Sequence, residues 1–121
     1  MGKITAMMPI AVLVILFQYP ATAQVFTSLV NFAGSNGATP MYMTLIEAND
    51  GNLYGTTIAG GANSEGVLFQ LTLSGQLKIV HSFCNGAGCP DGSQPYGGVI
   101  QATDGNLYGT TAFGGHSSNP G

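Results

Sequence analysis

The chain has 121 residues and a formal net charge of −3, and only 6% of its residues are charged. It contains no arginine, so it lacks the clustered cations that displace counterions from nucleic acid or bind an anionic membrane. Nucleic acid is therefore excluded as a partner. The 19 glycines and the scarcity of Glu, Lys and Arg favour short strands joined by turns over helices.

The first 23 residues have the layout of a secretory signal peptide. Lys3 precedes an apolar run over residues 6–17, and the small-x-small sequence of residues 21–23 predicts cleavage after Ala23. A membrane anchor is the alternative, but a spanning helix needs about 20 apolar residues. We therefore expect a secreted or cell-surface protein, with no membrane span after cleavage of the signal.

The first strands of the mature chain surround a hairpin turn. Residues 25–32 predict a leading strand, and two further strands flank Asn49-Asp50-Gly51. The second of these two strands covers residues 52–57. Asp-Gly between two strands is a strong hairpin signal, because both residues tolerate a positive φ.

Two more strands follow in the same unit. Residues 67–73 place an apolar side chain at every second position, which is typical of a strand, and a tight turn leads into a strand over residues 77–83. Leu77, Ile79 and Phe83 lie on one side of that last strand, and His81 shares their parity. We therefore expect His81 to be partly buried on the same side as Leu77 and Ile79.

The chain repeats itself. DGNLYGTTIAGG at residues 50–61 returns as DGNLYGTTAFGG at residues 104–115, and ten of the twelve positions are identical. Upstream, residues 29–32 align with residues 80–83, and Pro40 aligns with Pro95 once one extra residue, Met41, is allowed. A fixed internal period dictates the architecture of a protein. We expect repeat units at residues 40–94 and 95–121, the second incomplete, within one repeat region over residues 24–121.

Four consecutive antiparallel strands per unit predict an all-β meander, and at this period a blade of a β-propeller. A propeller closes with about four to eight blades, whereas this chain supplies about one and a half to two. We therefore interpret the chain as a fragment of a longer array, in which other repeats are needed for ring closure.

The acids of the repeated phrase have two interpretations. Asp50 and Asp104 could be calcium ligands or a general acid and base, or they could be turn residues that hydrogen-bond their own backbone. Against a calcium-binding loop, Tyr54 and Gly61 stand where oxygen ligands belong. The turn interpretation is favoured. The turn and repeat motif then comprises Asp50, Gly51, Asn52, Tyr54, Gly55, Asp104, Gly105, Asn106, Tyr108 and Gly109.

The remaining reactive side chains suggest no catalytic set. Glu47 has Gln101 at the matching position of the second copy, so the unit does not require an acid there. His81 matches Val30, which favours a structural histidine over a catalytic or metal-binding one. Cys84 and Cys89 stand five positions apart in a loop of an exported chain, and we expect them to form a disulfide.

The repeated unit resembles a known family. Residues 50–61, 66–75, 81–83 and 104–115 carry the resemblance, and residues 84–92 look like an insertion between its repeats. The chain is similar over residues 25–121 to the choice-of-anchor tandem repeat family, the Gloeo-Verruco repeat of bacterial secreted proteins. The resemblance implies an exported, repeat-built β-protein, often tethered to the cell surface by a variable C-terminal anchor. It carries no activity, cofactor, metal ligand or catalytic residue over to this chain.

Two classes of function stay open. The first is a non-catalytic exported scaffold whose loops bind an extracellular glycan, a protein or nothing specific. Four aromatic residues could supply such contacts, or could pack between blades: Tyr54, Tyr96, Tyr108 and Phe113. The second is a piece of an extracellular propeller enzyme, a hydrolase or lyase, whose active residues lie outside this chain.

Overall fold

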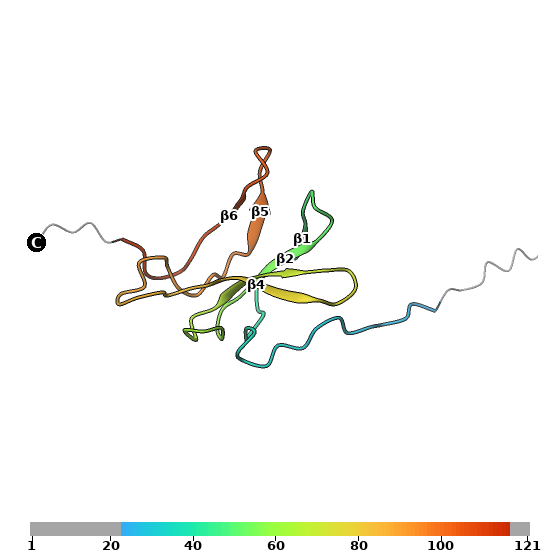
Figure 1. Cartoon of the computed structure of the whole chain (residues 1–121), viewed down its shortest axis with the longest axis horizontal. Coiled ribbons are helices and arrows are strands. Elements are labelled where there is room, and N and C mark those ends of the chain that lie inside the picture. Colours follow the sequence, from blue (N-terminus) through green and yellow to red (C-terminus); the bar gives the residue numbers. More distant parts are fainter. Residues whose placement is uncertain (1–22, 117–121) are drawn as a thin grey trace, which may run out of the picture.

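A computed structural model describes residues 23–116 of the chain. These residues form two antiparallel sheets (Figure 1). The first sheet has the order β1-β2-β3-β4, and the second pairs β5 with β6. The strands are β1 (Ile46–Glu47), β2 (Leu53–Thr57), β3 (Val67–Leu71), β4 (Leu77–Ser82), β5 (Val99–Gln101) and β6 (Leu107–Gly109). The part described holds no helix able to cross a membrane, and residues 1–22 of the expected signal peptide lie outside it.

The all-β expectation and the four-stranded meander are confirmed, because consecutive strands of the first sheet are neighbours in sequence order. The two hairpins that begin each copy turn at Gly51 and Gly105, whose φ values are 76° and 83°. This left-handed region is unfavourable for most side chains, so a glycine suits these positions. Each glycine ends a four-residue turn, in which the Gly51 amide bonds the Ala48 carbonyl and the Gly105 amide bonds the Ala102 carbonyl.

The core of the first sheet is built from alternate residues of β3. Val67, Phe69 and Leu71 are 0%, 1% and 3% exposed. On this face they receive Phe32, whose ring centroid lies 5.1 Å from that of Phe69, and the half-buried side chains of Val30, Met43, Leu53, Leu77 and Ile79. The alternation of apolar residues along β3 therefore places one face of the sheet in the core.

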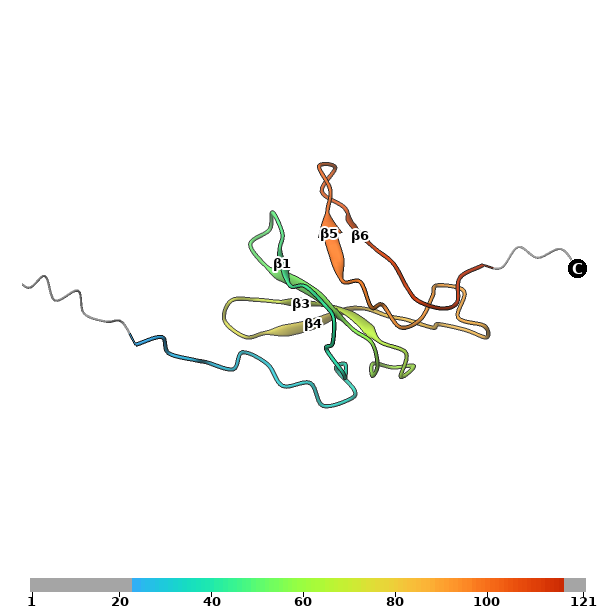
Figure 2. The same cartoon turned by 180° about the vertical axis from the view of Figure 1, so that it is seen from behind.

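The predicted leading strand over residues 25–32 is wrong. No strand is assigned between residues 23 and 45, and Val25 and Phe26 are fully exposed. The segment passes the β3–β4 turn, where the Leu29 carbonyl lies beside Gly75, and then reaches the core with Val30 and Phe32. It contributes apolar side chains to the face of the sheet rather than backbone hydrogen bonds to an edge. Figure 2 shows this segment on the side of the sheet opposite β5 and β6.

A β-bulge in β4 corrects the expected orientation of His81. Phe69 pairs with Ile79 but Leu68 pairs with His81, so Val80 is the extra residue on β4. A bulge places the residues on its two sides opposite neighbouring positions of the partner strand, and these point to opposite faces. Ile79 consequently joins the core with Phe69, whereas His81 lies on the other face with Leu68.

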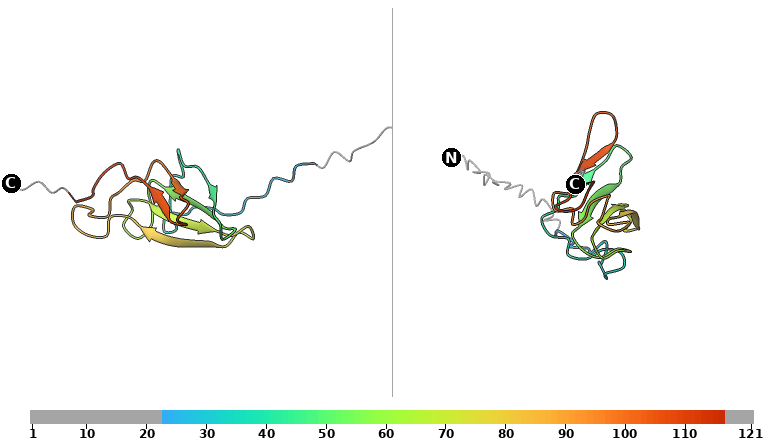
Figure 3. Two further views of the ribbon diagram at one scale, coloured as in Figure 1. Left: turned by 90° about the horizontal axis from the view of Figure 1, so that it is seen from above. Right: turned by 90° about the vertical axis from the view of Figure 1, so that its left-hand side faces the viewer.

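The second hairpin covers that other face. β5 contacts both β1 and β2, and Figure 3 shows β5 and β6 stacked above the first sheet. Two hydrogen bonds fix the arrangement: the buried Thr56 hydroxyl donates to the Pro95 carbonyl at 3.0 Å, and the Asn49 amide donates to Gln101 Oε1 at 2.8 Å. The first sheet is therefore covered on one face by the N-terminal segment and on the other by the second copy.

The loops that precede the two copies have the same conformation. Ala38 bridges Ala59, and Ser93 bridges Phe113 in the same antiparallel way. Thr39 and Gln94 both have a positive φ, 54° and 53°. Thr39 and Gln94, like Ala38 and Ser93, are 55 residues apart, whereas the copies of DGNLYGTT are 54 apart, which places the one extra residue between Thr39 and Asp50.

Candidate functional site

The repeated phrase folds into a hydrogen-bonded turn centred on its aspartate. Asp50 Oδ1 accepts a bond from the Asn52 amide at 3.0 Å, and Oδ2 accepts from Asn52 Nδ2 at 3.0 Å and from the Tyr54 hydroxyl at 2.8 Å. In the second copy Asp104 accepts the same three bonds from Asn106 and Tyr108, at 2.9, 3.0 and 2.7 Å. Both carboxylates are thus occupied by neutral donors of their own hairpin.

These donors stabilise the ionised form of each carboxyl. The side-chain and backbone bonds from Asn52, followed by the Tyr54 hydroxyl, lower the pKa of Asp50 from 3.8 to about 2. The bonds from Tyr108 and Asn106 lower the pKa of Asp104 in the same way. The carboxylate conversely raises the pKa of Tyr54, because losing the hydroxyl proton would remove the bond to Asp50.

The two turns differ in one partner. Gln70 on β3 donates to the Tyr54 hydroxyl at 2.7 Å and to Asp50 Oδ2 at 3.2 Å, which closes a network across β2 and β3. Asp104 and Tyr108 have no corresponding glutamine within residues 23–116. The hydrogen-bond network of Asp50 and Tyr54 therefore includes a glutamine from the neighbouring strand, whereas that of Asp104 and Tyr108, at the outer edge of β6, has no such partner among the described residues.

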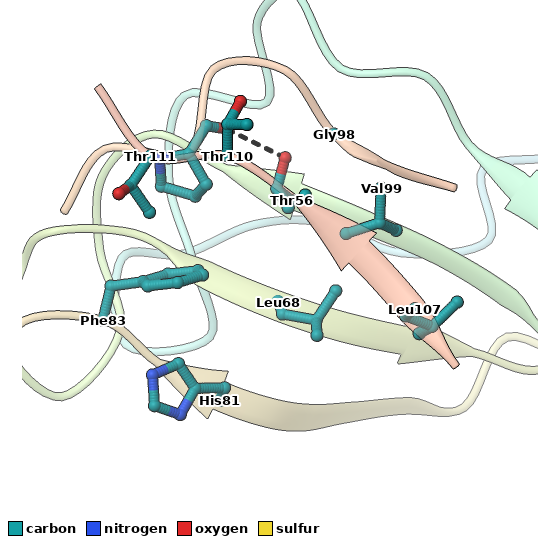
Figure 4. Close-up of a pocket in the computed structure, with 11 residues that line it drawn as sticks. Thr56, Leu68, His81, Phe83, Gly98, Val99, Leu107, Thr110 and Thr111 are labelled. Carbon is teal, nitrogen blue, oxygen red and sulfur yellow. Dashed lines mark hydrogen bonds between the residues drawn. The ribbon is translucent and has the colours of Figure 1, made fainter. Parts of the chain in front are cut away.

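A cavity of about 240 Å³ lies between the first sheet and the second hairpin (Figure 4). Its walls are mostly apolar and come from both copies: Thr56, Leu68, His81, Phe83, Pro95, Gly98, Val99, Leu107, Gly109, Thr110 and Thr111. In Figure 4, Leu68 and Phe83 approach the cavity from the first sheet, and Val99 and Leu107 approach it from the second hairpin. Such a space suits an apolar group rather than a charged substrate.

His81 stands at the edge of this cavity and is held by Asp91. Its Nε2 lies 2.8 Å from Asp91 Oδ2, and its ring meets Phe83 edge-on with centroids 4.8 Å apart. Partial burial of Asp91 alone would raise its pKa, but bonds from the Asn85 amide, its own backbone and His81 together lower it. The pair joins β4 to the loop that follows it, which is a structural task.

That loop carries the disulfide between Cys84 and Cys89. Several backbone bonds order it, including one from the Cys84 amide to the Gly92 carbonyl at 2.9 Å. The Cys89 carbonyl also accepts the amide of Gly115 at 2.8 Å, so the disulfide loop is attached to the end of the second copy. Within the described residues, no group of three or more His, Cys, Asp or Glu side chains lies close enough together to hold a metal ion.

The other residues singled out by the sequence lie apart from one another. Glu47 is exposed at the end of β1, whereas Gln101, its counterpart, bonds across to the first copy. Tyr96 lies 6.2 Å from Tyr42, ring centroid to centroid, and Tyr108 and Phe113 are exposed. Sequence reasoning missed Gln101 and Thr56 as links between copies. Their only signal in the sequence was position: Gln101 lies just before the second copy of the phrase, and Thr56 lies within the first.

Comparison with known proteins gives one match. A profile described as the Gloeobacter/Verrucomicrobia repeat matches residues 14–121, which is most of the chain. Searches of curated proteins and of solved structures found no match. The aspartate-centred turn recurs in both copies inside the matched region. The chain belongs to the Gloeobacter/Verrucomicrobia repeat family.

Proposed function

We propose that the protein is a non-catalytic, exported repeat scaffold in which each unit supplies a face for the next. The main support for this proposal is the packing of the second hairpin on the first sheet, through the Thr56–Pro95 and Asn49–Gln101 hydrogen bonds. Both bonds join a residue of one copy to the following copy. An interface of this kind can be extended by further units without any change in its chemistry.

The stacking geometry supports a propeller as the complete form. Sheets placed face against face, each an antiparallel meander of four strands, are the arrangement of propeller blades. The first sheet has an apolar core on one face and the second hairpin on the other, so both of its faces are used. We propose that such units continue into a ring of blades displayed outside the cell.

The proposal is tested by breaking the contact between units. Thr56→Val leaves the buried Pro95 carbonyl without its donor, which costs about 1–3 kcal/mol. Hydrogen exchange should then show loss of protection in β5 and β6, while β3 stays protected. Thr72→Val is the matched control, because its hydroxyl serves only the β3–β4 turn. Unchanged protection of β5 and β6 in Thr56→Val would contradict stacking as the basis of the scaffold.

Export is tested on the same chain. Expression with its own leader should give a mature product outside the cytoplasm whose N-terminal residue is Gln24. Cys84 and Cys89 should resist alkylation until a reductant is added. A product that keeps Met1 and stays in the cytoplasm would overturn the exported part of the proposal.

A further inference from the structure

We propose that the outer edge of β6, with the cavity beneath it, is a binding site for an extended strand of the pattern Val-Leu-Phe-Gln-Leu supplied by a further repeat unit. The inference deepens the proposed function and rests on it, since it names the segment that the second unit accepts. β6 would pair with this strand by backbone hydrogen bonds, while the phenylalanine enters the cavity and the glutamine closes the turn network. This is recognition by addition of a strand to a sheet edge.

The first copy provides the template. β2 and the chain from Leu107 to Thr111 have the same sequence, Leu-Tyr-Gly-Thr-Thr. β2 pairs along its whole length with β3, whose sequence is Val-Leu-Phe-Gln-Leu. Within residues 23–116, β6 pairs with β5 alone. The same five-residue sequence therefore has an edge that is paired in the first copy and that has no strand partner among the described residues in the second.

The phenylalanine position is specified by a glycine. Phe69 lies directly opposite Gly55, and a Cβ at Gly55 would stand only 2.8 Å from the end of that ring. Gly109 holds the same place in β6 and lines the cavity. A side chain at either position would fill the space that the ring needs.

The walls of the cavity correspond to the residues around Phe69. Phe32 packs on Phe69, and Phe83, which aligns with Phe32 in the sequence, lines the cavity. Leu53 contacts the same core, and its counterpart Leu107 is also in the wall. At about 240 Å³ the cavity exceeds the roughly 150 Å³ in which an apolar protein cavity holds benzene. It therefore has the position and the size for one aromatic side chain.

The glutamine position is specified by the turn. In the first copy Gln70 donates to both the Tyr54 hydroxyl and Asp50. Tyr108 and Asp104 reproduce that pair, 2.7 Å apart, on the open edge. A glutamine next to the phenylalanine of an added strand would point to this face, since successive side chains of a strand alternate.

The test uses a fluorescent peptide with the sequence of residues 65–78, EGVLFQLTLSGQLK, added to the purified full chain. We expect saturable binding by anisotropy, with amide shift changes in isotope-labelled protein concentrated at residues 107–111. The Phe69→Ala peptide should bind about tenfold or more weakly, because burying a phenylalanine side chain contributes about 1.5–3 kcal/mol. The affinity of the Gln70→Ala peptide should be about two- to tenfold lower.

A matched pair of protein variants assigns the site. Tyr108→Phe should weaken binding of the peptide about as much as the Gln70→Ala change in the peptide does. Tyr54→Phe should leave the affinity unchanged, because the Tyr54 hydroxyl already accepts a hydrogen bond from Gln70 of β3 in the same chain. Equal binding of all three peptides, or shift changes along β4 instead of β6, would overturn the inference. Unchanged protection of β5 and β6 in Thr56→Val would refute the proposed function, whereas the expected loss of protection in that variant, with no peptide binding to the unaltered chain, would refute only this site.

Discussion

At the scale of single residues, the aspartate of the repeated phrase organises its own hairpin. Asp50 accepts bonds from Asn52 and Tyr54 of the phrase and from Gln70 of β3, so one carboxylate has three partner residues. The sequence alone favoured this turn over a calcium site, since Tyr54 occupies a ligand position. What it did not reveal is the tyrosine hydroxyl as a third donor, because that contact depends on the pleat of β2 bringing the ring back over the turn.

The depressed pKa of Asp50 predicts acid instability. The folded state holds this pKa at about 2, below the unfolded value near 3.8, so its contribution to the free energy of unfolding is present above about pH 4 and is lost as the pH falls toward 2. Denaturant midpoints measured from about pH 6 down to about pH 2 should therefore decrease. Asp50→Asn should flatten this decrease, while Glu47→Gln, an exposed control, should not. A midpoint that does not change with acid would refute the prediction.

At the scale of elements, local rules account for what could be predicted. The Asp-Gly turns and the alternation from Val67 to Leu71 depend on neighbouring residues only, and both are present in the structure. The prediction of a leading strand at residues 25–32 was wrong, because an apolar pattern indicates which side chains are buried and not whether a strand edge is available for pairing. The predicted face of His81 was wrong because the bulge at Val80 depends on how β4 pairs with β3. The cavity could not be predicted, since it needs two copies in contact.

The bulge predicts an asymmetry between two deletions. Removal of Val80, which is half-exposed and unpaired, should restore an unbroken β3–β4 ladder with Ile79 and His81 on their present faces. We expect the unfolding free energy to fall by about 1 kcal/mol or less. Removal of Gln70 from the unbroken part of β3 should turn the following residue to the opposite face and abolish cooperative unfolding. Thermal denaturation followed by circular dichroism distinguishes the two, and equal losses would contradict the assignment of the bulge.

At the scale of the whole molecule, apolar side chains remain uncovered around the second copy. Ile100, Tyr108 and Phe113 are 65%, 51% and 61% exposed, and the outer edge of β6 has no partner strand among residues 23–116. Exposed apolar surface beside an unpaired strand edge favours association between molecules.

Self-association is therefore expected for the purified chain. Sedimentation velocity over about a hundredfold range of concentration should show a rising average mass, and the melting temperature should rise with concentration. Ile100→Lys places a charge on the exposed apolar surface opposite Tyr108 and should reduce the association. Leu73→Ala, in the exposed β3–β4 turn, is the control. A monomer with one melting temperature at every concentration would contradict the expectation.

The bulge at Val80 makes β4 serve two neighbours at once, since Ile79 completes the core of its own sheet while His81 borders the cavity beneath the next copy. Val30 and Phe32 stand in the aligned places ahead of the first copy and fill its core. Each unit is therefore completed by side chains that precede its own DGNLYGTT phrase. A gene duplication that copied only the phrase and its hairpin would produce a unit without its supporting residues. For such an array to lengthen, the segment that is duplicated must begin upstream, in the strand of the preceding unit.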